Sequence, residues 1–125
     1  LYAAVQLIKI LSNSDKKLSE HIDKIPKVFN TPEIRIDCED DKKFTLINNI
    51  SKSQKKLKKE IVDIDGLRVK SEDGWWLLRA SNTQPCIVLR CESTSKIGLK
   101  NQLIKVKEAV KEFDTKISQK IVVEN

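Results

Sequence analysis

Two Asp-Gly dipeptides, each set beside short apolar segments, constrain the fold of this chain more than any other feature. Asp65-Gly66 lies between residues 61–64 and 67–70, and Asp73-Gly74 leads into residues 75–78. An Asp-Gly dipeptide flanked by apolar segments is a strong signal for a β-hairpin turn. Another apolar segment follows at 87–92. We therefore expect an antiparallel sheet in this half of the chain.

Helical periodicity appears on both sides of these segments. Apolar side chains recur at three- and four-residue spacing in residues 1–11, 18–25, 44–57 and 99–113, which is typical of amphipathic helices. Residues 33–38 instead alternate between apolar and polar side chains and predict a strand. The pattern indicates an α+β domain, with an antiparallel sheet of about four strands flanked by two helices.

The segment from Pro26 to Pro32 has no periodicity, and we interpret residues 27–32 as a connector between two structural units. The chain contains no methionine and opens on residues typical of a helix interior. We therefore expect it to be part of a longer polypeptide.

The net charge of +6 permits binding of nucleic acid or of smaller anions. Much of the excess lies in one run of lysines, at positions 52, 55, 56, 58 and 59. These positions fall on more than one face of a helix and have no aromatic side chains among them, whereas a platform for stacking bases needs aromatics. A solvated helix end is the favoured interpretation, and a basic nucleic-acid-binding module stays open as an alternative.

Several classes of site and location are disfavoured. No apolar run approaches the ~18 residues that a membrane span requires. The three cysteines (Cys38, Cys86 and Cys91) are odd in number and lack Cys-x-x-Cys spacing, which indicates a reducing, cytoplasmic compartment and no zinc site. His21, the single histidine, is expected at the surface. We expect neither a catalytic residue nor a metal ligand in this chain.

The segment from Arg79 to Pro85 carries the most distinctive chemistry. Between two apolar strands it offers the guanidinium of Arg79, the hydroxyls of Ser81 and Thr83 and the amide of Asn82. A guanidinium gives charge-assisted bidentate hydrogen bonds and the neutral groups give directional ones, which together suit a phosphate dianion. Ser, Asn and Thr also favour turns by bonding their own backbone, so composition alone leaves a plain turn as the alternative.

The chain resembles the C-terminal domain of the α-D-phosphohexomutases, in their phosphomannomutase/phosphoglucomutase branch. The resemblance is carried by residues 65–69 (Asp-Gly-Leu-Arg-Val), by 72–85, which include Arg-Ala-Ser-Asn-Thr-Gln-Pro, and by 88–90 (Val-Leu-Arg). Residues 31–35 resemble the segment that enters this domain, and residues 1–25 resemble the last helices of the preceding domain. The implied organisation is the end of a third domain (1–26), a hinge (27–32), the C-terminal domain (33–115) with a TATA-box-binding-protein-like fold, and a tail (116–125).

The resemblance also implies a role. Members of the family interconvert hexose 1- and 6-phosphates through a hexose bisphosphate, using a phosphoserine in the first domain and Mg²⁺ in the second. The fourth domain binds the phosphate that is not being transferred, here a phosphate of mannose or glucose. By motif match, Arg79, Ser81, Asn82 and Thr83 fill this role, and Arg90 either orients the loop or is a plain surface side chain. The other three domains would be the partners, and a non-catalytic phosphosugar-sensing domain remains an alternative.

Overall fold

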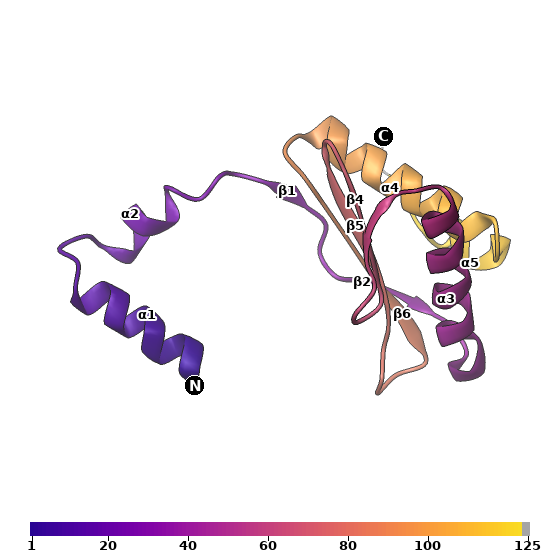
Figure 1. Ribbon diagram of the computed structural model, residues 1–125, viewed down its shortest axis with the longest axis horizontal. Helices are drawn as coiled ribbons and strands as arrows, with labels where there is room; N and C mark the ends of the chain where they lie inside the picture. The colour runs from indigo at the N-terminus through magenta and orange to yellow at the C-terminus, as the bar shows by residue number, and fades with distance from the viewer. Residues whose placement is uncertain (124–125) are drawn as a thin grey trace.

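The computed structural model describes residues 1–123 and contains a six-stranded antiparallel sheet with helices on one face (Figure 1). The elements in chain order are α1 (Tyr2–Ser12), α2 (Leu18–Ile22), β1 (Phe29–Asn30), β2 (Ile34–Asp37), α3 (Asp40–Lys56), β3 (Glu60–Val62), β4 (Leu67–Ser71), β5 (Gly74–Ala80), β6 (Cys86–Ser93), α4 (Lys96–Lys111) and α5 (Thr115–Gln119). The α+β class and the antiparallel sheet are confirmed.

The sheet has the order β1-β6-β5-β4-β3, and β2 also pairs with β6. β1 and β2 therefore share one edge of β6, so the six strands occupy five positions where the sequence predicted about four strands. The longest strands, β5 and β6, form the centre and pair over seven registered positions, from Gly74 with Ser93 to Ala80 with Ile87.

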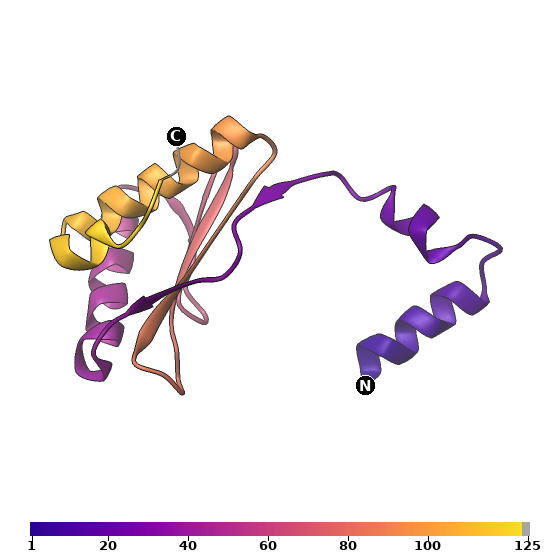
Figure 2. The same cartoon turned by 180° about the vertical axis from the view of Figure 1, so that it is seen from behind.

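Helices α3, α4 and α5 cover one face of the sheet in both views (Figures 1 and 2). The buried side chains between them form a single apolar core that includes Leu67, Trp76, Leu89 and Val106. Because side chains alternate along each strand, the residues between these buried ones face the opposite, uncovered side. Cys38, Cys86 and Cys91 are all buried and free, so the thiols act as small apolar side chains.

The helical spacing in residues 44–57 matches the buried face of α3 at Ile47, Ile50 and Gln54 but not at its two ends. Phe44 is 55% exposed, and Lys43 is buried in its place with 3% exposure. Residues 43, 47, 50 and 54 share one face at helical spacing, so the stem of Lys43 packs inward and its ammonium group contacts Asp40 and Gln84. Leu57, the last residue of this range, directly follows α3 and is 59% exposed.

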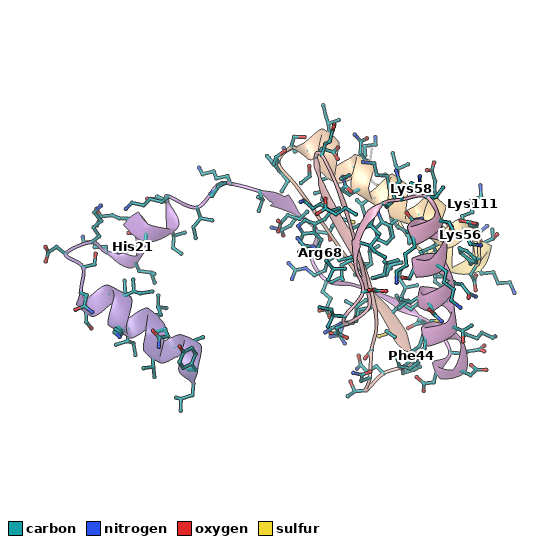
Figure 3. The ribbon with its side chains drawn as sticks, in the orientation of Figure 1. His21, Phe44, Lys56, Lys58, Arg68 and Lys111 are labelled. Carbon is teal, nitrogen blue, oxygen red and sulfur yellow. The ribbon has the colours of Figure 1, made fainter. Side chains whose placement is uncertain are left out.

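The lysine run lies where the sequence placed it, at the end of a helix. Lys55 and Lys56 occupy the last turn of α3, where the negative end of the helix dipole favours cations. Lys58 then adopts a left-handed backbone with φ of 54°. The side chains labelled Lys56, Lys58 and Lys111 point away from the sheet in Figure 3.

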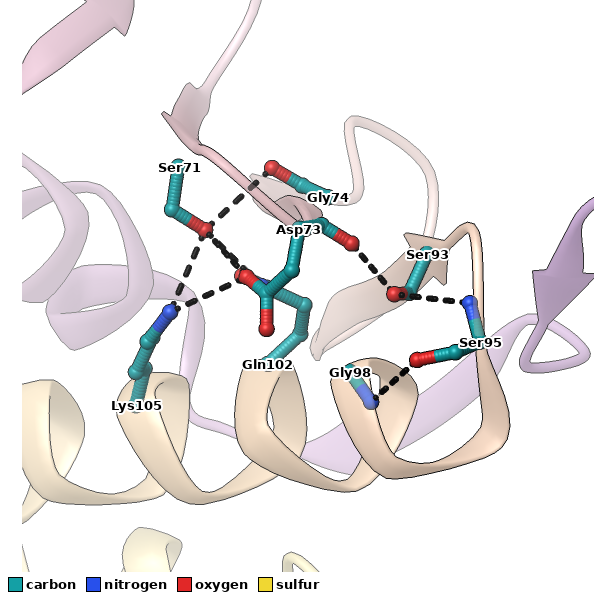
Figure 4. Close-up of polar contacts among 8 residues, drawn as sticks. All are labelled: Ser71, Asp73, Gly74, Ser93, Ser95, Gly98, Gln102 and Lys105. Carbon is teal, nitrogen blue, oxygen red and sulfur yellow. Dashed lines mark hydrogen bonds and ion pairs between the residues drawn. The ribbon is translucent and has the colours of Figure 1, made fainter.

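The turn between β4 and β5 is tied to the start of α4 (Figure 4). The Asp73 carboxylate accepts hydrogen bonds from Gln102, at 2.6 Å, and from Lys105, at 3.3 Å. The Ser93 hydroxyl donates to the Asp73 carbonyl, and the Ser95 side chain caps α4 by accepting from the backbone N–H of Gly98 at 2.9 Å. This network fixes the β4–β5 turn against the helix layer.

The predicted connector is only partly free of regular structure. Phe29 and Asn30 pair with the end of β6, and Thr31 exchanges two hydrogen bonds with Cys91, each of 3.0 Å. In both views, α1 and α2 lie away from the sheet (Figures 1 and 2). Neither helix contains a buried residue.

Much of the segment that the sequence assigns to a tail packs on the domain. α5 buries Ile117 and Ser118, Ile121 is also buried, and the Ser118 hydroxyl donates to the Lys107 carbonyl at 3.0 Å. Residues 124–125 of the predicted tail lie outside the described residues. No helix among the described residues has the length and apolar character that a bilayer crossing requires.

Candidate anion-binding site

The loop between β5 and β6 is a short, internally bonded turn. The backbone N–H of Ser81 donates to the Cys86 carbonyl at 3.0 Å, which closes the loop. The Ser81 hydroxyl oxygen accepts from the backbone N–H groups of Gln84, at 3.1 Å, and Thr83, at 3.4 Å. Part of Ser81 is therefore used in shaping the turn, as the alternative interpretation expected, while its hydroxyl proton stays available for an acceptor outside the loop.

Two further contacts attach the far side of the loop to the domain. The buried ammonium of Lys43 donates to the Gln84 carbonyl at 2.9 Å, and the backbone N–H of Cys38 donates to the Pro85 carbonyl at 2.9 Å. The loop is thus held from α3 and from the end of β2. Such support keeps the donor groups in one arrangement before any ligand arrives.

Arg79 lies at the end of β5 on the uncovered face of the sheet. Its side chain is 43% exposed, and its guanidinium is 3.6 Å from the Asp65 carboxylate. An exposed ion pair of this length contributes at most about 1 kcal/mol, so an incoming anion can compete with Asp65.

Gly66 explains why Asp65 lies there. Its φ of 87° suits the turn, and a Cβ at this position would lie 2.5 Å from the Leu78 carbonyl oxygen. The turn therefore packs directly on the backbone of β5, beside Arg79.

A polar pocket of about 340 Å³ opens above this loop on the uncovered face. Its lining residues combine the loop with the edge strand: Glu33, Arg35, Arg79, Ala80, Ser81, Asn82, Thr83, Gln84 and Val88. Asn82 and Thr83 are exposed, and within residues 1–123 their side chains make no hydrogen bond to protein. The pocket offers two guanidinium groups, two hydroxyls and two amides to a single ligand, which is a donor set suited to phosphate.

The structure brings together four of the five residues that the sequence singled out. Arg79, Ser81, Asn82 and Thr83 line the pocket, whereas Arg90 does not. Arg90 pairs with Leu77 further along β6 and is exposed on the same face.

Sequence reasoning missed two contributors. Arg35 lines the pocket from β2, and its guanidinium donates to the Gln84 side-chain oxygen; Lys43 holds the loop from below. Alternation along 33–38 does predict that Arg35 faces away from the core. No pattern within 33–38 places it beside a loop about 45 residues later.

The described residues do not fit a metal site. Among them there is no group of three or more His, Cys, Asp or Glu side chains that could hold a metal ion. The Mg²⁺ that the family resemblance implies has no candidate ligand set among residues 1–123.

The β5–β6 hairpin of this α+β domain presents arginine, hydroxyl and amide donors in one pocket, a donor set that suits an anion. Residues 33–109 match the family description "Phosphoglucomutase/phosphomannomutase, C-terminal domain". The chain therefore belongs to the phosphoglucomutase/phosphomannomutase family, and this part of it is the family's C-terminal domain.

Individual proteins that are similar to this chain carry names of the same family. A phosphomannomutase/phosphoglucomutase of Pseudomonas aeruginosa PAO1 is 35% identical over 118 residues, which cover 94% of this chain and 25% of that protein. A phosphoglucomutase of Neisseria gonorrhoeae is 41% identical over 101 residues, covering 79% of this chain and 22% of the relative. A crystal structure of a phosphoglucomutase/phosphomannomutase family protein from Burkholderia thailandensis superposes with a TM-score of 0.70 at 33% identity, over 89% of this chain and 23% of that one. The chain thus spans about a quarter of the length of these relatives.

Proposed function

We propose that this chain binds the phosphate group of a phosphorylated hexose, as the C-terminal part of an enzyme that interconverts hexose 1- and 6-phosphates. The observation that carries the proposal is the pocket in which Arg79 and the loop residues Ser81, Asn82 and Thr83 converge. The names of the relatives, phosphomannomutase/phosphoglucomutase and phosphoglucomutase, support a phosphosugar as the ligand.

The pocket suits a positioning role better than tight binding. A hydrogen bond to a charged group contributes about 1.5–3 kcal/mol net, so an arginine with a few neutral donors gives an affinity of roughly millimolar. Binding a phosphate that does not react can orient the sugar toward the reacting group. Donors that contact only phosphate also accept the sugar in either orientation, as an interconversion through a hexose bisphosphate requires.

We propose that the other parts of this reaction belong to the remaining domains, with a phosphoserine and Mg²⁺ among them. Residues 1–26 would then be the last helices of the preceding domain, which agrees with their exposed apolar side chains, including Val5 and Ile8. The hydrogen bonds of Phe29 to Thr31 with β6 support a hinge between the domains that lies before Phe29. The three unpaired, buried cysteines support a reducing compartment such as the cytoplasm.

The proposal is tested by titrating the isotope-labelled chain with glucose 1-phosphate, mannose 6-phosphate and unphosphorylated glucose. We expect backbone amide shifts concentrated in residues 79–84 with both phosphates and none with glucose. Arg79→Gln should weaken phosphate binding about tenfold or more, as the loss of a charge-assisted contact predicts.

A short DNA duplex in the same titration tests the alternative, a nucleic-acid-binding module. Shifts centred on the lysines of 52–59, with an affinity that falls steeply as salt rises, would favour that module. Phosphosugar shifts that spread over the surface and survive in Arg79→Gln would refute the proposed phosphate site.

A further inference from the structure

We propose that Arg35 is a second phosphate-binding guanidinium of this pocket, and that the pair Arg35 and Arg79 makes the site selective for a dianionic phosphate ester over a monoanionic ester. The inference deepens the proposed function and rests on it. It assigns a phosphate contact to a residue of β2, which lies outside the loop between β5 and β6.

The sheet register places the two arginines on either side of one residue. Val88 on β6 pairs with Arg35 on β2 and with Arg79 on β5. Directly opposed residues of neighbouring antiparallel strands point to the same face, and strands lie about 4.8 Å apart. The two arginine backbones therefore stand about 10 Å apart across Val88.

Val88 links the two arginines to one pocket. Val88 belongs to the uncovered face of the sheet, yet it is only 4% exposed. The same residue lines the polar pocket together with Arg35 and Arg79. Arg35 and Arg79 therefore border the same pocket from the two strands that flank Val88, with the Arg79 guanidinium paired to Asp65.

Arg35 keeps donors free for a ligand. Its Nε and Nη2 bond one oxygen of Glu33, at 2.9 and 2.8 Å, and its Nη1 donates to the Gln84 side-chain oxygen. A guanidinium has five N–H donors, so two remain. The side chain is 57% exposed, and an exposed pair with Glu33 is weak enough for a phosphate to compete with it.

The charge balance of the pocket explains the expected selectivity. A phosphomonoester carries close to two negative charges at neutral pH, and a sulfate ester carries one. Arg79 and Arg35 together match a dianion, whereas Glu33, which lines the same pocket, opposes any anion once Arg35 no longer neutralises it. Removing Arg35 should therefore weaken binding of a dianion more than binding of a monoanion.

The test measures affinities of the 125-residue chain for glucose 6-phosphate and glucose 6-sulfate at pH 7.5 and low salt, by amide shifts of residues 79–84. We expect the wild-type chain to prefer the phosphate, and Arg35→Gln to lower phosphate affinity about fivefold to tenfold while changing sulfate affinity less. Glu33→Gln should strengthen binding of both esters.

The matched control is Arg68→Gln, which removes the same charge from the same face. Arg68 lies 4.4 Å from the centre of the Trp75 ring and does not line the pocket, so this variant should change either affinity by less than twofold. Unchanged amide spectra outside the pocket would verify that the variants are folded.

Three results would overturn the inference, and they are distinguishable. If Arg35→Gln binds phosphate like the wild type while Arg79→Gln does not, Arg35 is no contact and the proposed function stands. Equal weakening of phosphate binding by Arg35→Gln and Arg68→Gln would mean that the effect comes from the lost positive charge on this face and not from a contact with the phosphate. A wild-type chain whose loop amides shift with neither ester would remove the proposed function and this inference together.

Discussion

Lys43 is the residue whose position most directly supports the candidate site. It is almost fully buried in α3, and its ammonium contacts the Asp40 carboxylate and the Gln84 carbonyl. We expect Lys43→Met, which keeps most of the packed stem, to destabilise the domain by about 1 kcal/mol, because one buried charge and its hydrogen bonds are lost together. Hydrogen exchange of the amides of residues 81–84 should accelerate.

Lys42→Met provides the control for this prediction, since Lys42 is exposed and pairs only with Glu39 on the same helix. It should change the unfolding free energy by less than about 0.5 kcal/mol. Unaltered loop exchange in Lys43→Met would mean that Lys43 does not hold the loop.

The cysteines give a prediction about reactivity. Burial raises the pKa of the Cys91 thiol to about 12. The pKa of Cys38 is also raised, mainly by burial and further by the nearby charges of Asp114 and Glu39. The thiolate is the reactive form, so these thiols should not react with Ellman's reagent at pH 8 in the native chain, and Cys86, which is also buried, should be protected by burial alone. All three should react in urea; labelling of the folded chain within minutes would contradict the packing described.

At the residue scale, the sequence predicts which chemical groups a segment offers better than it predicts which other segments lie beside them. Arg79 and the loop hydroxyls were predictable because they lie within five positions. Arg35 and Lys43 were not, because a polar residue on a strand or helix indicates only a solvent-facing side until the fold brings another segment beside it. Phe44 shares the helical spacing of the buried Ile47 and Ile50, yet α3 turns Lys43 inward and leaves Phe44 55% exposed.

At the scale of elements, the β4–β5 turn links the sheet to α4 through a titratable group. Partial burial raises the pKa of Asp73, but hydrogen bonds from Ser71 and Lys105 and the charge of Lys105 outweigh it, so the net shift is downward. A carboxyl group with a lower pKa in the folded state stabilises the fold above its unfolded pKa of about 3.9, and the contribution is lost as the pH falls through the folded value.

We therefore expect Asp73→Asn to lower the unfolding free energy at pH 7 and to reduce its dependence on pH below about 4. Urea unfolding at pH 7, 4 and 2.5 measures both effects. Parallel pH profiles for the variant and the wild type would exclude a contribution from Asp73.

The start of α4 packs closely on the end of β6. A Cβ at Gly98 would lie 2.1 Å from the Ser93 hydroxyl oxygen. Gly98→Ala should therefore destabilise the domain by about 1–3 kcal/mol through overpacking, although alanine favours a helix. In a Ser93→Ala background the same change should cost less, because the clashing oxygen is gone. Equal costs in the two backgrounds, compared in a double-mutant cycle, would show that this contact is not the cause.

The helices and the central strands were predictable because their signals are local: helical spacing, Asp-Gly turns and alternation. β1 was not, because it has two residues and exists only through pairing with β6. The same limit applies to α5, whose packing depends on the surface of α4 and not on its own short sequence.

At the scale of the whole molecule, the chain contains a packed domain and an N-terminal segment that adds nothing to its core. Because α1 and α2 bury no residue, deleting residues 1–27 should leave the melting temperature of the sheet domain within about 3 °C of the wild type. It should also improve solubility by removing the exposed apolar side chains of α1. A deletion that unfolds the domain in calorimetry would mean that these helices pack on the sheet.

The distribution of arginines supports a ligand on the uncovered face. The chain has four arginines, at positions 35, 68, 79 and 90, and the strand registers place all of them on this face. Figure 3 shows Arg68 on the side of the sheet away from the helices. The domain therefore places all four arginines on the face that it leaves free of helices.

A crystal of the chain soaked in glucose 6-phosphate, at several times a millimolar dissociation constant, would examine the central claim most directly. We predict electron density for the phosphate in the pocket, with its oxygens about 3 Å from the Arg79 guanidinium and the Ser81 hydroxyl, and with Arg79 moved off Asp65. A pocket without sugar phosphate, in which Arg79 still pairs with Asp65 and the loop groups bond only to the protein, would contradict the account.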